Sequence, residues 1–149
     1  MKDNIIKILS EGNYLSKTTK TKDGRMYNGI TTVKYIKDDN KNTVGLKIKH
    51  NGEDNHEDTV YYFFTGNDII SLHTSDITNA SHNSTITKVT NNTIINKGIG
   101  FSHSTNSQVK FKKLIKKNTQ TNDVITKIYI KDKNDNYKLH SKIISKILS

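Results

Sequence analysis

Lysines recur at alternate positions in two segments toward the C-terminal end of the chain, where they could bind phosphate groups. In residues 109–112 and 124–131 they alternate with Val, Phe, Ile and Thr, so a strand would present them on one outward face. Ammonium groups bind phosphates without fine geometry, and counterion release drives such binding. Arg25 is the only arginine, so bidentate reading of guanine is not expected. The predicted nucleic-acid-binding residues are Lys110, Lys112, Lys113, Lys116, Lys117, Lys127 and Lys131, with 113–117 in a predicted connecting loop.

The alternative interpretation of these lysines is that they keep exposed strand edges soluble and unaggregated. The base composition of the gene bears on this choice. Asn, Ile and Lys abound, whereas the chain has one Ala and no Pro, Cys or Trp, which indicates a very A+T-rich genome. This composition resembles that of proteins from giant viruses, some phages and linear plasmids, and it supplies lysine without any function.

Two histidine motifs could transfer protons. His73-Thr74-Ser75 and His103-Ser104-Thr105 follow the pattern His-x-Ser/Thr, which resembles that of two-histidine phosphodiesterases. The resemblance implies that two histidines exchange protons across a phosphodiester while the hydroxyls hold the phosphate. It covers six residues, its 30-residue spacing is shorter than the two halves of that family need, and His82-Asn83-Ser84 fits the pattern too. His73 and His103 are therefore secondary catalytic candidates, and an enzyme is less expected than a binding protein.

Acidic residues are concentrated in one part of the chain. Residues 51–80 contain six acidic residues and no Lys or Arg, whereas residues 81–149 contain thirteen Lys and three Asp. A polyanion bound by the second region would be repelled by the first, so the loop 51–58 is instead a candidate site for a protein partner. This loop and the residue before it hold oxygen and nitrogen ligands that match no standard metal-binding loop. We predict a solvated acidic hairpin tip, with no metal and no cofactor: His50, Glu53, Asp54, His56, Glu57 and Asp58.

Aromatic residues follow in the segment Thr59–Thr65, which is continuously apolar and aromatic and is predicted to be a central strand. Alternate rings of such a strand point to opposite faces, so one pair enters the core and the other could stack nucleic-acid bases. The alternative is that nearly all of the rings belong to the core. The rings concerned are Tyr61, Tyr62, Phe63 and Phe64, with Tyr35, Phe101 and Tyr129 as further candidates.

The hydrophobic periodicity predicts one α+β domain over residues 1–149 that is mainly β. A short helix is expected at 3–10, a β-rich core at 26–132 and an amphipathic helix at 137–149, with Lys138, Lys142 and Lys146 on one helical face. The core is expected to be a curled antiparallel sheet or small barrel of about seven or eight short strands. Residues 74–85, rich in Ser, Thr and Asn, are predicted to be a loop.

The N-terminus lacks the features of a signal peptide and no stretch is long and apolar enough to span a membrane, so no membrane partner and a cytoplasmic location are expected. The sequence predicts a protein that binds single-stranded DNA or RNA through its phosphates, from a mobile element, virus or other A+T-rich genome. Two alternatives stay open. One is a structural or host-factor-interaction protein, and the other is a metal-free histidine-dependent nuclease or phosphodiesterase.

Overall fold

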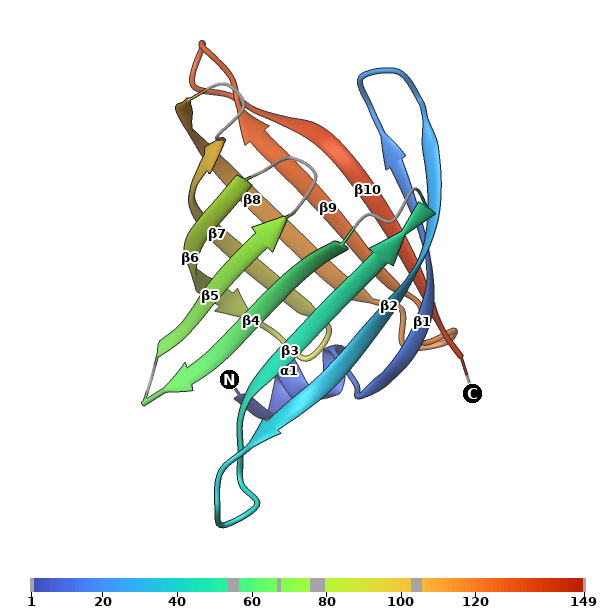
Figure 1. Ribbon diagram of the computed structural model, residues 1–149, viewed down its shortest axis with the longest axis vertical. Helices are drawn as coiled ribbons and strands as arrows, with labels where there is room; N and C mark the ends of the chain where they lie inside the picture. The colour runs from blue at the N-terminus through green and yellow to red at the C-terminus, as the bar shows by residue number, and fades with distance from the viewer. Residues whose placement is uncertain (1, 54–56, 67, 76–79, 103–105, 149) are drawn as a thin grey trace.

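A computed structural model describes residues 2–53, 57–66, 68–75, 80–102 and 106–148. Over this part of the chain one helix is followed by ten strands (Figure 1). The elements are α1 (Lys2–Ile8), β1 (Gly12–Lys20), β2 (Met26–Lys37), β3 (Thr43–Gly52), β4 (Glu57–Thr65), β5 (Asp68–Ser75), β6 (Ala80–Val89), β7 (Thr93–Ser102), β8 (Ser107–Lys117), β9 (Val124–Lys131) and β10 (Tyr137–Ile147).

The ten strands form a closed antiparallel barrel. Each strand pairs with the next along the chain, and β1 closes the barrel by pairing with β10, Ser16 lying opposite Ser145. Strands β2–β5 face β7–β10 across the interior (Figure 1). Because successive side chains of a strand alternate between its faces, each strand supplies one row to the barrel interior and one to the outside.

Strand β8 shows this alternation clearly. Phe111, Lys113 and Ile115 are buried, whereas Lys110 and Lys116 on the other face are exposed. Register is strongly specified wherever one face is buried, because a slip by one residue would exchange the two faces. The register of β8 with its neighbours therefore decides which of its many lysines enter the barrel.

The turns carry polar residues that suit their backbone conformation. Asp38 accepts hydrogen bonds at Oδ1 from the backbone N–H groups of Asn40 and Asn42, both at 2.9 Å. Asp132 does the same in the turn between β9 and β10, with N–H groups at 2.9 and 3.0 Å. Lys41 and Asp135 adopt positive φ angles of 63° and 67° at the matching positions of these two turns. Local side-chain hydrogen bonds of this kind stabilise turns.

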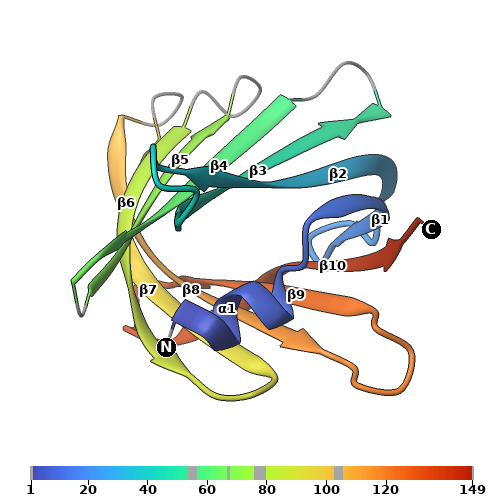
Figure 2. The same ribbon diagram turned by 90° about the horizontal axis from the view of Figure 1, so that it is seen from below.

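Helix α1 lies across one end of the barrel (Figure 2). Its residues Ile5 and Ile8, with Leu9 just after it, are buried in the core. The end of the helix is held by hydrogen bonds from the barrel: Lys117 Nζ donates to the carbonyl of Lys7 at 2.7 Å, and the Tyr14 hydroxyl donates to the carbonyl of Ser10. We call the interior next to α1 the closed half of the barrel; its buried residues are Ile5, Ile8, Leu9, Leu46, Ile69, Ile86, Ile94 and Ile115.

The structure confirms a mainly β fold with a curled antiparallel sheet, and a short N-terminal helix is present. The expected strand number of seven or eight is too low, because neither β1 nor β10 was expected as a strand. Residues 74–75 and 80–85, predicted to be part of a loop, belong to β5 and β6. The expected C-terminal helix at 137–149 is wrong, since residues 137–147 form β10. The spacing of Leu139, Ile143 and Ile147 fits a helix, but β10 is held between β9 and β1 by hydrogen bonds to both.

Candidate functional site

A cavity of about 400 Å³ lies inside the barrel, beyond the core cluster that packs against α1. Small-molecule sites usually measure about 300–1,000 Å³ and are lined mainly by apolar groups. Six strands supply most of the aliphatic wall of this cavity, and Leu9, just after α1, also lines it. The apolar wall residues used below are Val33, Ile48, Val60, Ile115, Ile128 and Ile143.

Polar side chains on four consecutive strands form a connected hydrogen-bond chain in the cavity wall. Ser16 Oγ lies 2.9 Å from Ser145 Oγ and 2.7 Å from Thr31 Oγ1, which in turn lies 2.9 Å from His50 Nδ1. Three of the four residues line the cavity, and Ser16 is buried behind them. Because these groups satisfy one another, they place polar atoms in an apolar wall without leaving any of them unpaired.

Gly29 is needed for the position of His50. A Cβ atom at Gly29 would lie 2.7 Å from His50 Cε1 and 2.7 Å from the carbonyl oxygen of Asn51. Such a short contact with the backbone of β3 would force the two strands apart. Gly29 therefore allows the imidazole to lie over β2 and reach Thr31.

The cavity also contains ionisable groups. Lys113 lines it from β8 and is only 8% exposed, so burial lowers the pKa of its amine to about 8 while Asp58 opposes part of that decrease. Lys20, at the end of β1, and Asp58, near the start of β4, also line the cavity. Burial also lowers the pKa of Lys20, and again Asp58 has the opposite effect.

Buried polar groups surround Lys113. On the neighbouring strand β7, the residue directly opposite Lys113 is Asn96. Asn96 is fully buried, and its side-chain amide atoms have no hydrogen-bond partner among the described residues. Tyr62 is 1% exposed and lines the cavity; burial raises the pKa of its hydroxyl to about 12, and the neighbouring Asn96 opposes part of this increase. The interior around Lys113 therefore combines apolar walls with buried polar atoms.

The structure divides the seven predicted phosphate-binding lysines into two groups. Five of them point outward from β8 and β9, but Lys113 lies inside the barrel and Lys117 is bonded to the end of α1. The expected loop at 113–117 is wrong because β8 continues to Lys117, and its register turns both of these side chains inward. The outward lysines are Lys110, Lys112, Lys116, Lys127 and Lys131.

These five outward lysines and two others form what we call the outer basic surface, completed by Lys97 on β7 and Lys142 on β10. Lys97 lies directly opposite Lys112, and Lys127 lies directly opposite Lys142. Tyrosines lie between the lysines: Lys112 Nζ is 4.9 Å from the centre of the Tyr129 ring and 5.1 Å from that of Tyr137. Lys131 forms a 3.0 Å ion pair with Asp135, which raises the pKa of the amine.

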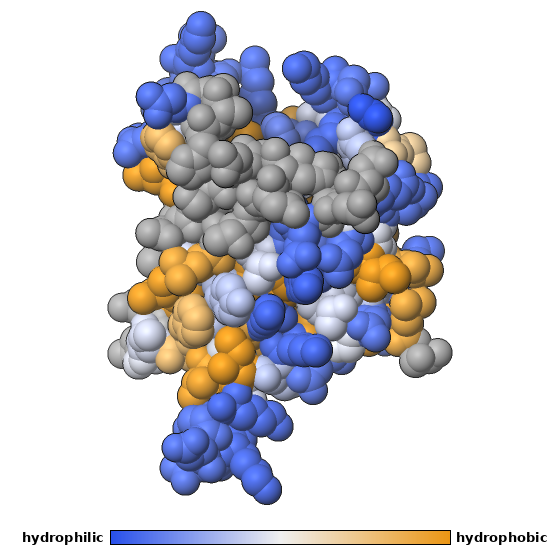
Figure 3. All heavy atoms as spheres, in the orientation of Figure 1, coloured by the Kyte–Doolittle hydropathy of each residue, from blue (hydrophilic) through white to orange (hydrophobic). Residues whose placement is uncertain are grey.

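The aromatic residues of β4 divide as their alternation predicts. Tyr62 is buried and Phe64 packs against the core, whereas Tyr61 and Phe63 stack on each other with ring centres 5.9 Å apart. Exposed Ile70 and Leu72 of β5 lie opposite this outward pair, and hydrophobic residues are visible on this face in Figure 3. In the barrel β4 is separated from β8 by three strands, so the structure does not bring these rings to the outer basic surface. Of the other candidates, Tyr129 lies beside Lys112 on that surface, Phe101 of β7 has the same phase as Lys97, and Tyr35 packs against the core.

The histidine candidates are not brought together by any described contact. His103 lies outside the described residues, and His73 is described only by its backbone, which places it in β5 opposite His82. In the acidic segment, Glu57 forms a 3.3 Å ion pair with Lys49, and Asp58 turns toward the cavity. Asp54 and His56 lie outside the described residues. Over the described ranges no group of three or more His, Cys, Asp or Glu side chains could hold a metal ion.

No protein-family model matches the chain, and no curated protein matches it. In the described part of the chain, no helix has the length and apolar character needed to cross a membrane. Sequence analysis missed the cavity-lining residues of the barrel, although the inward positions Ser141, Ile143 and Ser145 alternate regularly once β10 is recognised as a strand.

Proposed function

We propose that this protein binds a small, largely apolar molecule inside its barrel. The observation that carries the proposal is the cavity of about 400 Å³ inside the closed barrel, lined by described residues of seven strands. An eight-stranded barrel has an interior just wide enough for side chains or one small ligand, and the diameter grows with strand number. Empty volume in a core lowers stability, so a cavity of this size is better explained by an occupant than by packing.

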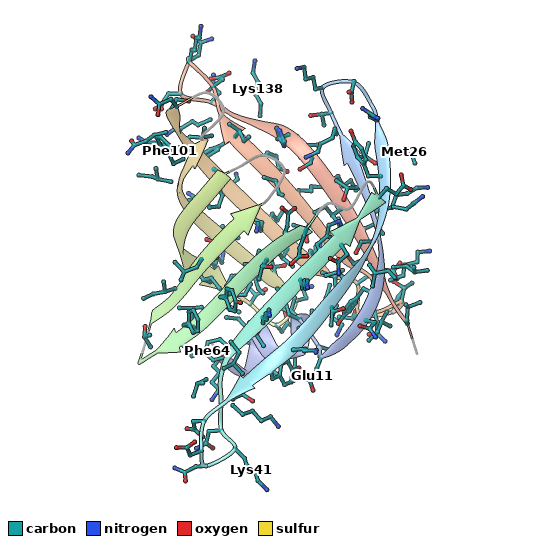
Figure 4. The ribbon with its side chains drawn as sticks, in the orientation of Figure 1. Glu11, Met26, Lys41, Phe64, Phe101 and Lys138 are labelled. Atoms are coloured by element: carbon teal, nitrogen blue, oxygen red, sulfur yellow. The ribbon has the colours of Figure 1, made fainter. Side chains whose placement is uncertain are left out.

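The arrangement of the two barrel ends supports this function. Phe64 and Glu11 mark the end that α1 covers, and Met26 and Lys138 mark the other end (Figure 4). Buried Ile5, Ile8 and Leu9 fill the interior below α1. A ligand would therefore be held in the half remote from α1, between the apolar walls and the hydrogen-bond chain of Ser145, Ser16, Thr31 and His50.

A neutral fluorescent dye, N-phenyl-1-naphthylamine, tests the proposal. We expect one molecule to bind per barrel with increased fluorescence, and Ile143→Trp to weaken binding by about tenfold or more because the larger ring fills the cavity. Ile144→Trp is the matched control, since Ile144 is the next residue on the same strand and has the opposite phase. Absence of dye binding, or equal affinities for both variants, would contradict the proposal.

We also propose a second function, sequence-independent binding of single-stranded DNA or RNA, which the outer basic surface supports. Tyr129 and Tyr137 add aromatic rings beside Lys112, a combination that single-strand binders use. Lys127 and Lys142 directly opposite each other are unfavourable without an anion between them.

Fluorescence anisotropy with labelled single-stranded DNA, duplex DNA and RNA at about 50 and 200 mM salt tests this second proposal. Replacing Lys110, Lys112, Lys127 and Lys131 together with Gln should weaken binding to all sequences and flatten the salt dependence. The control replaces four lysines of β2, β3 and their turn: Lys34, Lys37, Lys41 and Lys47. Equal losses in both quadruple variants would leave net charge as the explanation and would refute the outer basic surface as a site.

A further inference from the structure

We propose that the molecule held in the barrel carries one anionic group, a carboxylate on an apolar body, and that the Lys113 ammonium binds it. This inference rests on the proposed interior binding function and names the class of ligand. It concerns a single side chain in the cavity and is independent of the outer basic surface.

The position of Lys113 is the first argument. Its strand neighbours on the interior face are Phe111 and Ile115, and across the strands it lies opposite Ile128 and Asn96. Lysine is almost never fully buried without a partner, because its ammonium is strongly hydrated in water. Lys113 is nevertheless 8% exposed and lines the cavity. A strand with this register could carry Ile or Val there, as it does at Ile115, so the amine marks a function inside the barrel.

The charges that face Lys113 give the second argument. Among the described residues that line the cavity, Lys20 and Lys113 are basic and Asp58 is acidic. The remaining polar groups are hydroxyls and the His50 imidazole, which lies on β3, across the barrel from β8 (Figure 1). A ligand with one negative charge would balance the two amines and one carboxylate, whereas a neutral ligand would leave a buried positive charge uncompensated.

Desolvation provides the third argument. Burial lowers the pKa of the Lys113 amine more than the attraction of Asp58 raises it. Asp58 therefore does not compensate fully for the hydration that the amine loses. A carboxylate in contact with Nζ would supply a charge-assisted hydrogen bond in a region of low dielectric, where such bonds are strong. The apolar walls formed by Val60, Ile128 and Ile143 would hold the rest of the molecule.

Decanoate and decan-1-ol share one apolar chain and differ in charge, so their affinities compared by isothermal titration calorimetry at about pH 7 test the inference. We expect decanoate to bind about tenfold more tightly than the alcohol. The Lys113→Met variant should lose this preference but keep its affinity for decan-1-ol. Lys110→Met is the matched control, because it removes the same charge from the outer face of the same strand. The control should keep the full preference.

Each other outcome is informative. Equal binding of decanoate and decan-1-ol by the unmodified protein would overturn the anionic assignment and leave interior binding intact. A preference that survives Lys113→Met, or that Lys110→Met removes, would show that a group other than Lys113 binds the anion and would overturn the assignment. If neither compound nor the neutral dye binds, the interior function itself fails.

A second measurement needs no variant. The preference for decanoate should fall by about tenfold as the pH rises from about 7 to 10, because the Lys113 amine loses its proton while decanoate and Asp58 stay ionised. Burial also lowers the pKa of Lys20, the other amine in the cavity wall, so Lys20→Met is the control and should leave most of the fall in place. A preference independent of pH would refute the role of Lys113.

Discussion

The two halves of the barrel interior are built from the same strands, but one half is packed with side chains and the other surrounds a cavity. On β8 the inward series passes from Lys117, which is bonded to the end of α1, through Ile115 to Lys113; on β3 it passes from Leu46 to His50. The closed half is filled by aliphatic side chains from α1 and the sheet, whereas the other half surrounds a cavity. Strand pairing therefore creates the enclosure in both halves, while the inward residue at each level decides whether the interior is packed or open to a ligand.

The largest contrast concerns deletion of aliphatic groups in the two halves. Ile94→Ala in the closed half removes contacts from a fully buried side chain and should lower the free energy of unfolding by about 2–5 kcal/mol. Ile143→Ala in the cavity wall should cost less than half as much, since Ile143 already faces open volume. Urea denaturation followed by circular dichroism measures both. Equal losses would show that the two halves are packed alike.

Lys113→Met should increase the free energy of unfolding at pH 7. The pKa of about 8 lies below the ordinary value of 10.5, so the unfolded chain holds the proton more tightly. At about 1.4 kcal/mol per pH unit, burying the charged amine costs about 3 kcal/mol below pH 8. Stability of the unmodified protein should therefore rise, relative to the Met variant, between about pH 8 and 10.5. Denaturation midpoints at several pH values check this, and parallel curves for the two proteins would contradict it.

Lys117→Met should have the opposite sign at neutral pH, although Lys117 lies four residues further along the same strand. Lys117 Nζ donates to the Lys7 carbonyl at 2.7 Å and to Ser10 Oγ at 3.2 Å, at the C-terminal end of α1 where a cation is favourable. Its loss should lower the free energy of unfolding by about 1 kcal/mol. Increased hydrogen exchange confined to α1 would support this explanation, and unchanged protection there would exclude it.

The smallest effect is expected outside the barrel. Lys127→Gln removes one of two lysines that lie directly opposite each other and should raise the free energy of unfolding by a few tenths of a kcal/mol at low salt. High salt should abolish the gain, because it screens exposed charges. A loss of stability, or a gain that persists in high salt, would show that Lys127 contributes through packing.

The β character of the chain and several of its elements were predictable, because the alternation at 124–131 and the aromatic segment Thr59–Thr65 are local signals. The cavity was not predictable by the same means. In Lys112-Lys113 two adjacent lysines look like the end of a strand, and only the register with β7 and β9 places the second one inside. Burial of an amine follows from pairings distant in sequence, which periodicity within β8 does not contain.

The same reason explains the error at the C-terminus. The apolar residues of β10 fit both a helical and a strand spacing. The segment forms a strand because β1 and β9 form hydrogen bonds with its two edges. Residues 74–85 were predicted to be a loop from their Ser, Thr and Asn content. Most of them instead pair along β5 and β6 through the backbone, to which side-chain composition is a poor guide.

The seam between β1 and β10 has a consequence for how the chain reaches its folded state. All other pairings join consecutive strands and can form as local hairpins, but Ser16 and Ser145 are separated by almost the whole chain. Closing so long a loop costs chain entropy that no local contact offsets, so the seam is expected to form late and to limit the folding rate. Until it closes, the growing sheet has two unpaired edges, and the same step that completes the barrel removes the sites at which chains would aggregate.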